Sequence, residues 1–334
     1  MHMKNTNQRG RLEHFVVQSK TLVDNAMGDP IEREIAVYLP HGFNKSQHYP
    51  LLVEYAGYAN CGLGRIAWKG FGENVPERLD RLIQEGMPPV IVAFPDCFTR
   101  LGGNQYINTH LGRYADFIRE DVVPLIEQNF NCGGEGRRAC YGKSSGGYGA
   151  LMHGMLYPDF WAGIGCLSGD MGFEMLFSPI MARSLVILNE YGNSVQSFLQ
   201  DFEKNQNPKW PEIECLGFLC AAASFDPDPE QYLGIQLPLD PYTGERIAER
   251  WKNWLSYDPL NMVEKYESSL KKLKLVYFDC GNRDQFNLQF GARRLHILLE
   301  QKGINHVFEE FPGDHLNLDY RLDPCLKKIV NILK

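Results

Sequence analysis

The sequence predicts an α/β fold in which a mainly parallel sheet carries helices on both faces and a largely helical cap interrupts the pattern. Short apolar runs typical of buried strands alternate with amphipathic segments typical of helices through most of the 334 residues. The alternation stops between residues 168 and 267, a stretch that is too long for a plain loop and lacks the composition of a linker. We therefore expect one domain over residues 1–334, with a cap insertion at residues 168–267.

The first half of the chain predicts five strands and two helices before the central motif described below. The strands are expected at Leu12–Gln18, Ile31–Leu39, Tyr49–Ala56, Val90–Phe94 and Arg138–Tyr141, the first two as an antiparallel pair. The helices are expected at Asn74–Gln84, with Pro76 near its start and Gly86 just past its end, and at Gly112–Phe130. This order is that of a sheet built mainly from parallel strands.

The second half continues the same pattern on either side of the cap. After the helix that follows the motif, strands are expected at Ala162–Leu167, Leu273–Phe278 and His306–Phe311. Helices are expected at Gln285–Gln301 and Leu322–Leu333, and helical pieces within the cap at Ser197–Lys204 and Gly244–Leu255. The sequence shows no internal repeat and no low-complexity segment.

Composition excludes several classes of function. The formal net charge of −7 argues against nucleic acid or an anionic membrane surface as a partner, and no apolar run is long enough to span a bilayer. Residues 1–10 contain no apolar segment of a secretory signal, and the nine cysteines are scattered without a C-x-x-C pair. We expect reduced thiols and a cytoplasmic protein, with no metal site and no cofactor. Formation of a homodimer stays open.

The run Gly142-Lys143-Ser144-Ser145-Gly146 reads G-x-S-x-G and lies between a predicted strand and a predicted helix. In this context the glycines permit a sharp turn that exposes the central hydroxyl, so Ser144 is the candidate nucleophile for acyl transfer. The alternative is a glycine-rich turn with a serine helix cap. Ser145 fits less well as the nucleophile, because Lys143 stands two residues before it where the motif has glycine.

A serine nucleophile needs a base, and His315 is the best candidate among the three histidines after the cap. It lies in the loop between the last strand and the last helix, at the sheet edge where the motif also lies, whereas His296 is in a predicted helix and His306 begins a strand. A solvent-facing loop histidine is the alternative. The base needs an orienting acid, and Asp284 follows the penultimate strand in a loop that can reach His315.

Other carboxylates compete with Asp284. Asp170 follows the strand after the motif helix, a place where some hydrolases carry their acid. Asp279 lies closer to its strand, and Asp314 is adjacent to His315 with a side chain expected to point away.

The oxyanion of an acyl-transfer intermediate needs backbone donors. The residue after the nucleophile normally supplies one N–H, here that of Ser145, and the loop after the third strand supplies a second. In that loop Gly57 permits close approach and the N–H of Tyr58 is the candidate donor, although an ordinary glycine turn is nearly as good an interpretation.

Four further side chains are candidates for substrate contact. Lys143 could attract an anionic substrate, unless it is a variable position with its amine in solvent. Tyr106, in the loop before the long helix, could line the pocket. Trp251 and Trp254 share a predicted helix face, which packing within the cap explains better than a platform for an aromatic substrate.

In their order along the chain, these features resemble the putative-esterase (esterase D-like) family of α/β-hydrolases. The resemblance rests on the strand into Gly57, the motif followed by Gly147-Tyr148-Gly149, the turn Cys280-Gly281-Asn282-Arg283-Asp284 and the turn Pro312-Gly313-Asp314-His315, and covers roughly residues 31–332 without most of the cap. The family includes S-formylglutathione hydrolases, feruloyl and acetylxylan esterases, siderophore esterases and mycolyltransferases.

The resemblance implies that Ser144, Asp284 and His315 form a catalytic triad and that the N–H groups of Tyr58 and Ser145 form the oxyanion hole. The sequence departs from the family at Lys143, at Ser145 where many members have methionine, and in the length of the cap. We expect a serine esterase that cleaves small carboxylic esters through an acyl-enzyme. Acyl transfer to an alcohol, amide cleavage by the same triad, and a non-catalytic binding protein are the alternatives.

Overall fold

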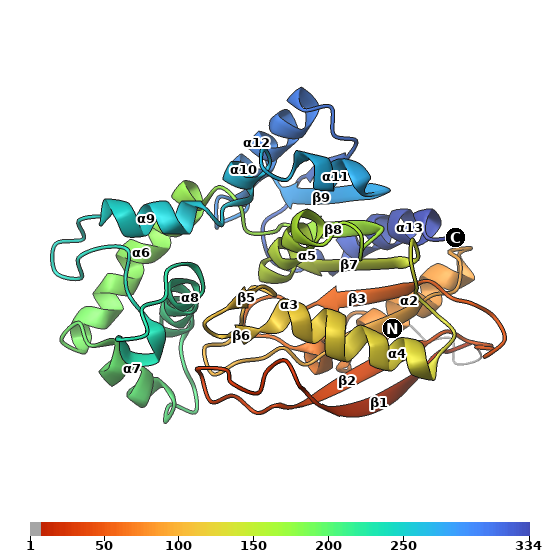
Figure 1. Ribbon diagram of the computed structural model, residues 1–334, viewed down its shortest axis with the longest axis horizontal. Helices are drawn as coiled ribbons and strands as arrows, with labels where there is room; N and C mark the ends of the chain where they lie inside the picture. The colour runs from red at the N-terminus through yellow and green to blue at the C-terminus, as the bar shows by residue number, and fades with distance from the viewer. Residues whose placement is uncertain (1–7) are drawn as a thin grey trace.

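The computed structural model describes residues 8–334, which form an eight-stranded sheet flanked by helices (Figure 1). The strand order is β1-β2-β4-β3-β7-β8-β9-β10. The strands are β1 (Arg11–Gln18), β2 (Glu32–Leu39), β3 (Leu51–Tyr55), β4 (Ile91–Pro95), β7 (Arg138–Lys143), β8 (Gly163–Leu167), β9 (Leu275–Gly281) and β10 (Val307–Phe311). Strand β2 is antiparallel to both neighbours, and the six strands from β4 to β10 are parallel. The predicted fold class is confirmed.

Both faces of the central strands are buried, which explains why these strands are mostly apolar, with Glu54 in β3 and Asp279 in β9 as exceptions. Along β3, Leu51, Val53 and Tyr55 pack into one core and Leu52 into the other, as alternation of side chains requires. The first core lies beneath α5 (Ser145–Leu156) and α12 (Leu288–Gln301), and the second beneath α2 (Val75–Gln84) and α13 (Leu322–Ile332). A strand that is covered on both sides does not alternate between apolar and polar residues, so a two-residue hydrophobic period cannot be used to predict it.

Helix α2 begins as its sequence suggests. The Asn74 side chain accepts a hydrogen bond from the N–H of Glu77 at 2.9 Å, and the Glu77 carboxylate accepts one from the N–H of Asn74 at 3.2 Å. This capping box satisfies two amide groups that the helix itself cannot. Asn74, predicted as the first helical residue, is therefore the cap that precedes it.

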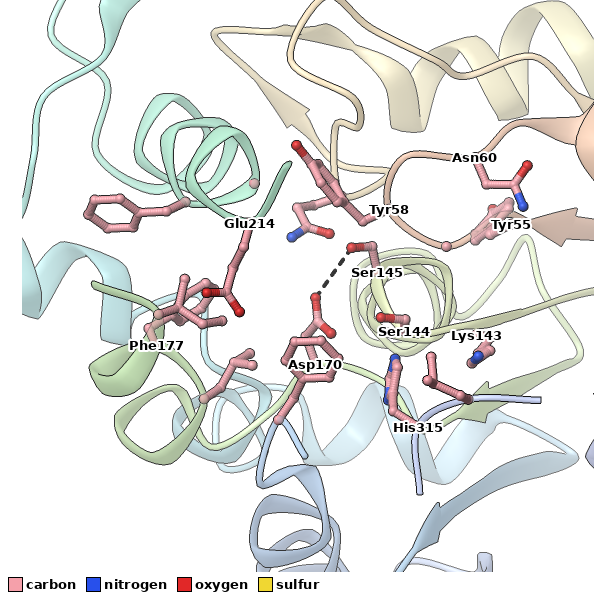
Figure 2. A pocket seen from close by; sticks show the side chains of 18 of the residues that line it. Tyr55, Tyr58, Asn60, Lys143, Ser144, Ser145, Asp170, Phe177, Glu214 and His315 are labelled. Carbon is pink, nitrogen blue, oxygen red and sulfur yellow. Dashed lines mark hydrogen bonds between the residues drawn. The ribbon is translucent and has the colours of Figure 1, made fainter. Parts of the chain in front are cut away.

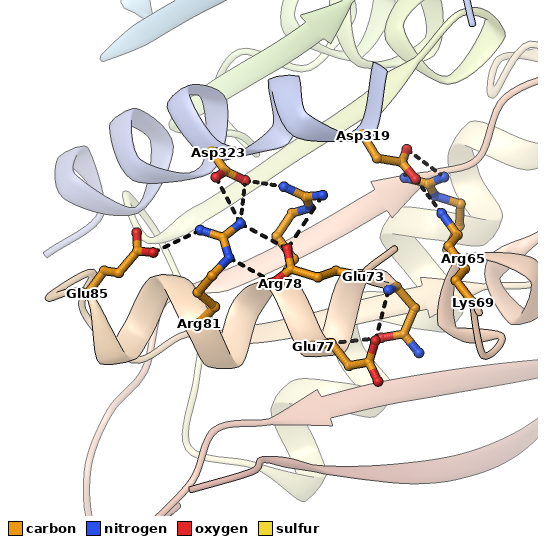
Figure 3. Close-up of polar contacts among 10 residues, drawn as sticks. Arg65, Lys69, Glu73, Glu77, Arg78, Arg81, Glu85, Asp319 and Asp323 are labelled. Carbon is orange, nitrogen blue, oxygen red and sulfur yellow. Dashed lines mark hydrogen bonds and ion pairs between the residues drawn. The ribbon is translucent and has the colours of Figure 1, made fainter. Parts of the chain in front are cut away.

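Ion pairs join α2 to α13 across one edge of the molecule (Figure 3). Arg78 and Arg81 both pair with Asp323 at the start of α13, Arg81 at 2.9 Å, and Glu73 pairs with Arg81 at 2.8 Å. Glu73, Arg81 and Asp323 are partly exposed, so the pairs that Arg81 makes with the two carboxylates each contribute at most about 1 kcal/mol to stability, whereas Arg78 is buried. Their geometric effect is to hold the beginning of α13, just after the loop that carries His315.

The long helix predicted at Gly112–Phe130 is wrong in its start and in its regularity. Gly112 pairs with Thr109 in a short hairpin of β5 (Asn108–Thr109) and β6 (Gly112–Arg113). The helix then runs as α3 (Tyr114–Asp116), a π-helical segment (Phe117–Val122) and α4 (Val123–Asn129). Pro124 lacks the N–H that a regular α-helix would donate four residues back, and the widened π turn precedes it.

The cap interval contains more helix than the sequence predicted. Its helices are α6 (Phe173–Glu190), α7 (Val195–Phe202), α8 (Trp210–Phe225), α9 (Ala248–Leu255) and α10 (Pro259–Met262), most of which lie together at one end of the sheet in Figure 1. Helices α6 and α8 were missed because their apolar residues are spread around the whole helix and α6 contains Pro179. Helix α11 (Glu267–Lys272) leads back to β9.

Two expectations from the sequence can be compared with the structure only within the described residues. No helix within residues 8–334 is long and apolar enough to cross a membrane. The expectation that residues 1–10 carry no secretory signal falls mostly outside the described range.

Candidate active site

Ser144 lies on a sharp turn between β7 and α5, with backbone angles of φ 56° and ψ −126°. A non-glycine residue adopts this conformation only when the surrounding structure imposes it. Gly142 and Gly146 make the turn possible, because a Cβ atom on either would lie 2.4 Å or 2.0 Å from the carbonyl oxygen of Tyr55. The Ser144 N–H donates to the carbonyl of Leu167 at 3.0 Å, which fixes the turn to β8.

His315 and Asp284 are joined by a hydrogen bond of 2.7 Å between Nδ1 and Oδ2. The Asp284 side chain is fully buried, and its other oxygen accepts the N–H of Phe286 at 2.8 Å. Because an ionised carboxylate only accepts hydrogen bonds, the histidine proton is on Nδ1 and Nε2 is left as an acceptor. Figure 2 shows a ring nitrogen of His315 turned toward Ser144.

The His315 ring is held by its own loop and by a neighbour. Its backbone N–H donates to the Gln285 side chain at 2.9 Å, and the ring packs edge to face against Phe286 with centroids 4.9 Å apart. Both residues lie in the loop that also carries Asp284, so one short segment positions Asp284 and contacts His315.

Apart from Asp170, which is described below, the other acids and histidines weighed from the sequence make contacts away from Ser144. Asp279 is bonded to Arg321 at 2.9 Å, and the Asp314 carboxylate accepts the N–H of Leu316. His296 and His306 contact each other, with 2.8 Å between ring nitrogens. Asp284 is the carboxylate that bonds to His315.

The two predicted oxyanion donors lie on either side of Ser144. Ser145 is the first residue of α5, so its N–H is one of the helix amides without an intrahelical partner. Gly57 lies against the turn, because a Cβ added there would be 3.4 Å from the carbonyl of Lys143 and 3.7 Å from Ser144 Cβ. Within residues 8–334, the N–H groups of Tyr58 and Ser145 donate to no protein acceptor.

The Tyr58 side chain fixes this loop to two other parts of the molecule. Its hydroxyl donates to the carbonyl of Leu101 at 2.9 Å. Its ring fits against Gly102 and against Gly217 of α8, where an added Cβ would come within 2.9 Å and 3.1 Å of it. The loop that carries Tyr58 is therefore in direct contact with the cap.

The pocket over Ser144 has a volume of about 260 Å³ and is closed on one side by the cap. Helix α6 contributes Leu176, Phe177 and Ile180, and α8 contributes Trp210, Glu214, Gly217 and Phe218. Sequence reasoning missed these residues because it missed their helices. Gly57, Tyr58, Lys143, Ser145 and His315 also line the pocket. Burial lowers the pKa of the Lys143 amine.

Tyr106, Trp251 and Trp254 do not line this pocket. The Tyr106 ring stacks on Tyr55 with centroids 4.4 Å apart, and its hydroxyl donates to the carbonyl of Ala56 at 2.9 Å, so it supports the start of the loop that carries Tyr58. Trp251 and Trp254 are buried in the cap, where Trp254 packs against Phe177 and Phe225. The positions of all three correct the expectation of a direct contact, and the packing of Trp251 and Trp254 agrees with the role that the sequence favoured for them.

Asp170 and Gln105 line the pocket beside Ser145, and their side chains are almost completely buried. The Ser145 hydroxyl donates to Asp170 Oδ2 over 3.4 Å. Burial raises the pKa of the Asp170 carboxyl to about 6, against the opposing effects of His315, Gln105 and Ser145. Asp170 was considered from the sequence only as a rival acid, and no sequence signal marked Gln105.

A buried histidine supports the loop that carries Gln105. His153 accepts hydrogen bonds on Nδ1 from Tyr55 and Trp161, both at 3.0 Å, and its Nε2 donates to the carbonyl of Tyr106 at 2.8 Å. Burial lowers the pKa of His153 to about 3, so the ring is neutral. Gln105 and Tyr106 both have φ 58°, a strained conformation that this contact helps to hold.

Comparison with known proteins also indicates an esterase. The model of the family described as "Putative esterase" matches residues 25–323. A ferulic acid esterase structure has a TM-score of 0.62 at 19% identity and covers 98% of this chain and 100% of its own. The fluorophosphonate-binding serine hydrolase FphF of Staphylococcus aureus has a TM-score of 0.56 at 17% identity, with coverage of 97% and 99%.

An S-formylglutathione hydrolase from Agrobacterium tumefaciens has a TM-score of 0.57 at 17% identity and covers 99% of this chain and 98% of its own. None of the curated proteins matches the sequence. At these identities the structural likeness shows the α/β-hydrolase fold, and the family match covers most of the chain. The chain belongs to the Putative esterase family and is a carboxylic-ester hydrolase.

Proposed function

We propose that the protein hydrolyses carboxylic esters through an acyl-enzyme on Ser144, with His315 as the base and Asp284 as its orienting acid. The observation that carries the proposal is the 2.7 Å hydrogen bond from His315 Nδ1 to the buried Asp284, which leaves Nε2 as an acceptor on the side of Ser144. That tautomer is the one able to take a proton from a serine hydroxyl.

In the acylation half, Ser144 Oγ attacks the ester carbonyl while His315 Nε2 takes the hydroxyl proton. The negative charge on the carbonyl oxygen is stabilised by the N–H groups of Tyr58 and Ser145 and by the N-terminus of α5. His315 then gives its proton to the departing alkoxide, which leaves as the alcohol. Asp284 stabilises the transient imidazolium.

In the deacylation half, water replaces the alcohol. His315 takes a proton from the water as its oxygen attacks the acyl carbonyl, and the same two N–H groups stabilise the second oxyanion. Collapse breaks the bond to Ser144 Oγ, which recovers the proton from His315. The products are a carboxylic acid and the free enzyme.

The pocket supports a small ester substrate with an apolar part. Phe177 and Phe218 of the cap supply apolar surface opposite the polar groups around Ser144. The nine cysteines are all free thiols, which supports a reducing compartment such as the cytoplasm. The ferulate and formylglutathione named for similar structures are candidate substrates to include in a first screen.

Labelling with a fluorophosphonate, together with hydrolysis of p-nitrophenyl esters of increasing acyl length, tests the proposal. Ser144→Ala should lose the label and reduce kcat by on the order of 10⁶-fold, because it removes the nucleophile. Ser145→Ala, which retains its backbone N–H, should still carry the label. A folded Ser144→Ala protein with near-normal activity, or wild type that takes no label, would contradict the proposal.

A further inference from the structure

One wall of the pocket presents acceptors that no protein donor fully satisfies. Asp170 follows β8 and lines the pocket beside the nucleophile turn. Its carboxylate receives a long hydrogen bond from Ser145 Oγ at 3.4 Å, and the Gln105 side chain also acts on it by hydrogen bonding. No lysine or arginine within residues 8–334 forms an ion pair with it, and among neighbouring side chains His315 does most to oppose the rise of its pKa. A buried carboxylate with so little compensation is costly to maintain.

Gln105 adds a second, independent acceptor to the same wall. The residue is 7% exposed and lines the pocket, and its Oε1 atom accepts no hydrogen bond within residues 8–334. Its side chain also lowers the pKa of Asp170 by hydrogen bonding, which places the two side chains next to each other. A buried acceptor left without a donor costs about 1–3 kcal/mol, and a ligand donor would remove that cost.

The remaining charges of the pocket are already paired or lie elsewhere. Glu214 of α8 receives both arms of Arg183 at 2.6 Å and 2.7 Å, and Glu54 receives Arg65 at 2.5 Å. Figure 2 shows Lys143 on the opposite side of Ser144 from Asp170. The wall at Asp170 therefore keeps one negative charge at the pocket, beside the Gln105 amide and the Ser145 hydroxyl.

We propose that Asp170, Gln105 and Ser145 bind a primary ammonium group of the substrate, so that the preferred substrates are esters carrying an aminoalkyl group. A primary ammonium has a full positive charge and three N–H donors, which match the carboxylate, the amide oxygen and the serine hydroxyl. A hydroxyl offers one donor and no charge, and a quaternary ammonium offers charge without a donor. The inference rests on the proposed function, since it names the substrate of the same pocket.

The carbon skeleton next to that ammonium has a matching surface. Phe177 of α6 and Phe218 of α8 line the pocket together with Leu176 and Ile180. An arylalkyl amine therefore places its charged end at Asp170 and its apolar end against the cap.

Titration calorimetry on the Ser144→Ala protein tests this binding without any chemistry. The probes are 2-phenylethylammonium, 2-phenylethanol and (2-phenylethyl)trimethylammonium at pH 7.5, where Asp170 is ionised. We expect the primary ammonium to bind at least about tenfold more tightly than either of the others. In a Ser144→Ala, Asp170→Asn protein the preference over the alcohol should fall to about one. Asp240→Asn, which changes the same charge at a partly exposed position of the cap, should leave the preference as it was.

Three results would overturn the inference. Equal affinity for the ammonium and the alcohol would mean that the wall does not recognise the charged group. Equal affinity for the trimethylammonium would show attraction by charge or aromatic rings without the N–H donors that Gln105 requires. A preference that survives Asp170→Asn would place the recognition elsewhere. Because none of these measurements uses Ser144, they are separate from failure of the fluorophosphonate test, which bears on the esterase mechanism alone.

Discussion

The substitution Asp284→Asn should disable the base by moving its proton. Asp284 Oδ1 accepts the N–H of Phe286 at 2.8 Å, and Oδ2 faces His315 Nδ1 at 2.7 Å. In asparagine one of these two positions becomes an NH₂ group. The Phe286 N–H requires an acceptor, so the amide oxygen stays there and the NH₂ faces His315. Two donors cannot face each other, and the ring must then carry its proton on Nε2, next to Ser144.

The structure gives the size of the effect. The Asp284 side chain is 0% exposed, so no water can enter to restore the original tautomer. A histidine protonated on Nε2 cannot accept the serine proton, and kcat should fall about 10⁴-fold, equivalent to about 5.5 kcal/mol of transition-state stabilisation. The fold should persist because asparagine has the same shape.

Stopped assays with p-nitrophenyl acetate measure this loss, with circular dichroism to verify folding. Asp314→Asn is the matched control, because it changes the exposed carboxylate adjacent to His315 and should keep kcat within about threefold. A folded Asp284→Asn protein that retains more than a tenth of the wild-type kcat would refute the tautomer argument. A loss of about 10⁴-fold in Asp170→Asn instead would make Asp170 the orienting acid.

Two predictions concern stability and pH. His153 has a pKa of about 3 in the folded protein, against an ordinary value of 6.5. Between these pH values the unfolded state binds more protons than the folded state, so the free energy of unfolding falls as the pH drops. At pH 5 the loss is about 2 kcal/mol. Urea unfolding at pH 7.5 and 5 should show this component in wild type and not in His153→Gln, and equal pH dependence would contradict it. Asp170 has a pKa of about 6 against an ordinary 3.8, so the folded state binds more protons there and stability falls as pH rises from 3.8 to 6. Asp170→Asn should therefore stabilise the protein by up to about 3 kcal/mol above pH 6, and a lower unfolding midpoint in urea at pH 7.5 would show that the carboxylate is better satisfied than its surroundings indicate.

The catalytic candidates could be predicted because each lies at a place that a parallel sheet creates. Ser144, Asp284 and His315 all follow strands whose carboxyl ends meet at one edge, so their order along the chain was enough to bring them together in expectation. The 2.7 Å contact of Asp284 with His315 matches that expectation in geometry, while the roles of the residues stay proposals.

The pocket residues that α6 and α8 contribute could not be predicted from the sequence, and the reason is again physical. Helices α6 and α8 are apolar on all sides because they pack against each other and against the sheet domain, which removes the periodicity that marks a helix. Gln105 had no signal at all. Its place in the pocket depends on two successive residues at φ 58° and on a hydrogen bond from His153, forty-eight positions later, which only the folded chain reveals.

The contact between Tyr58 and Gly217 links the proposed oxyanion donor, which affects the rate of the reaction, to a cap helix that lines the substrate pocket. The residue whose N–H is proposed to stabilise the oxyanion has its ring against a cap helix, with no room for even one methyl group between them without displacement. A cap that is reshaped for a larger acyl or alcohol group must therefore shift Tyr58 as well, or keep the packing at Gly217 unchanged. Substitutions in α6 and α8 at residues that do not touch Tyr58 can therefore change the substrate preference without moving Tyr58. Exchange of the whole cap should instead lower kcat, even for the original substrate.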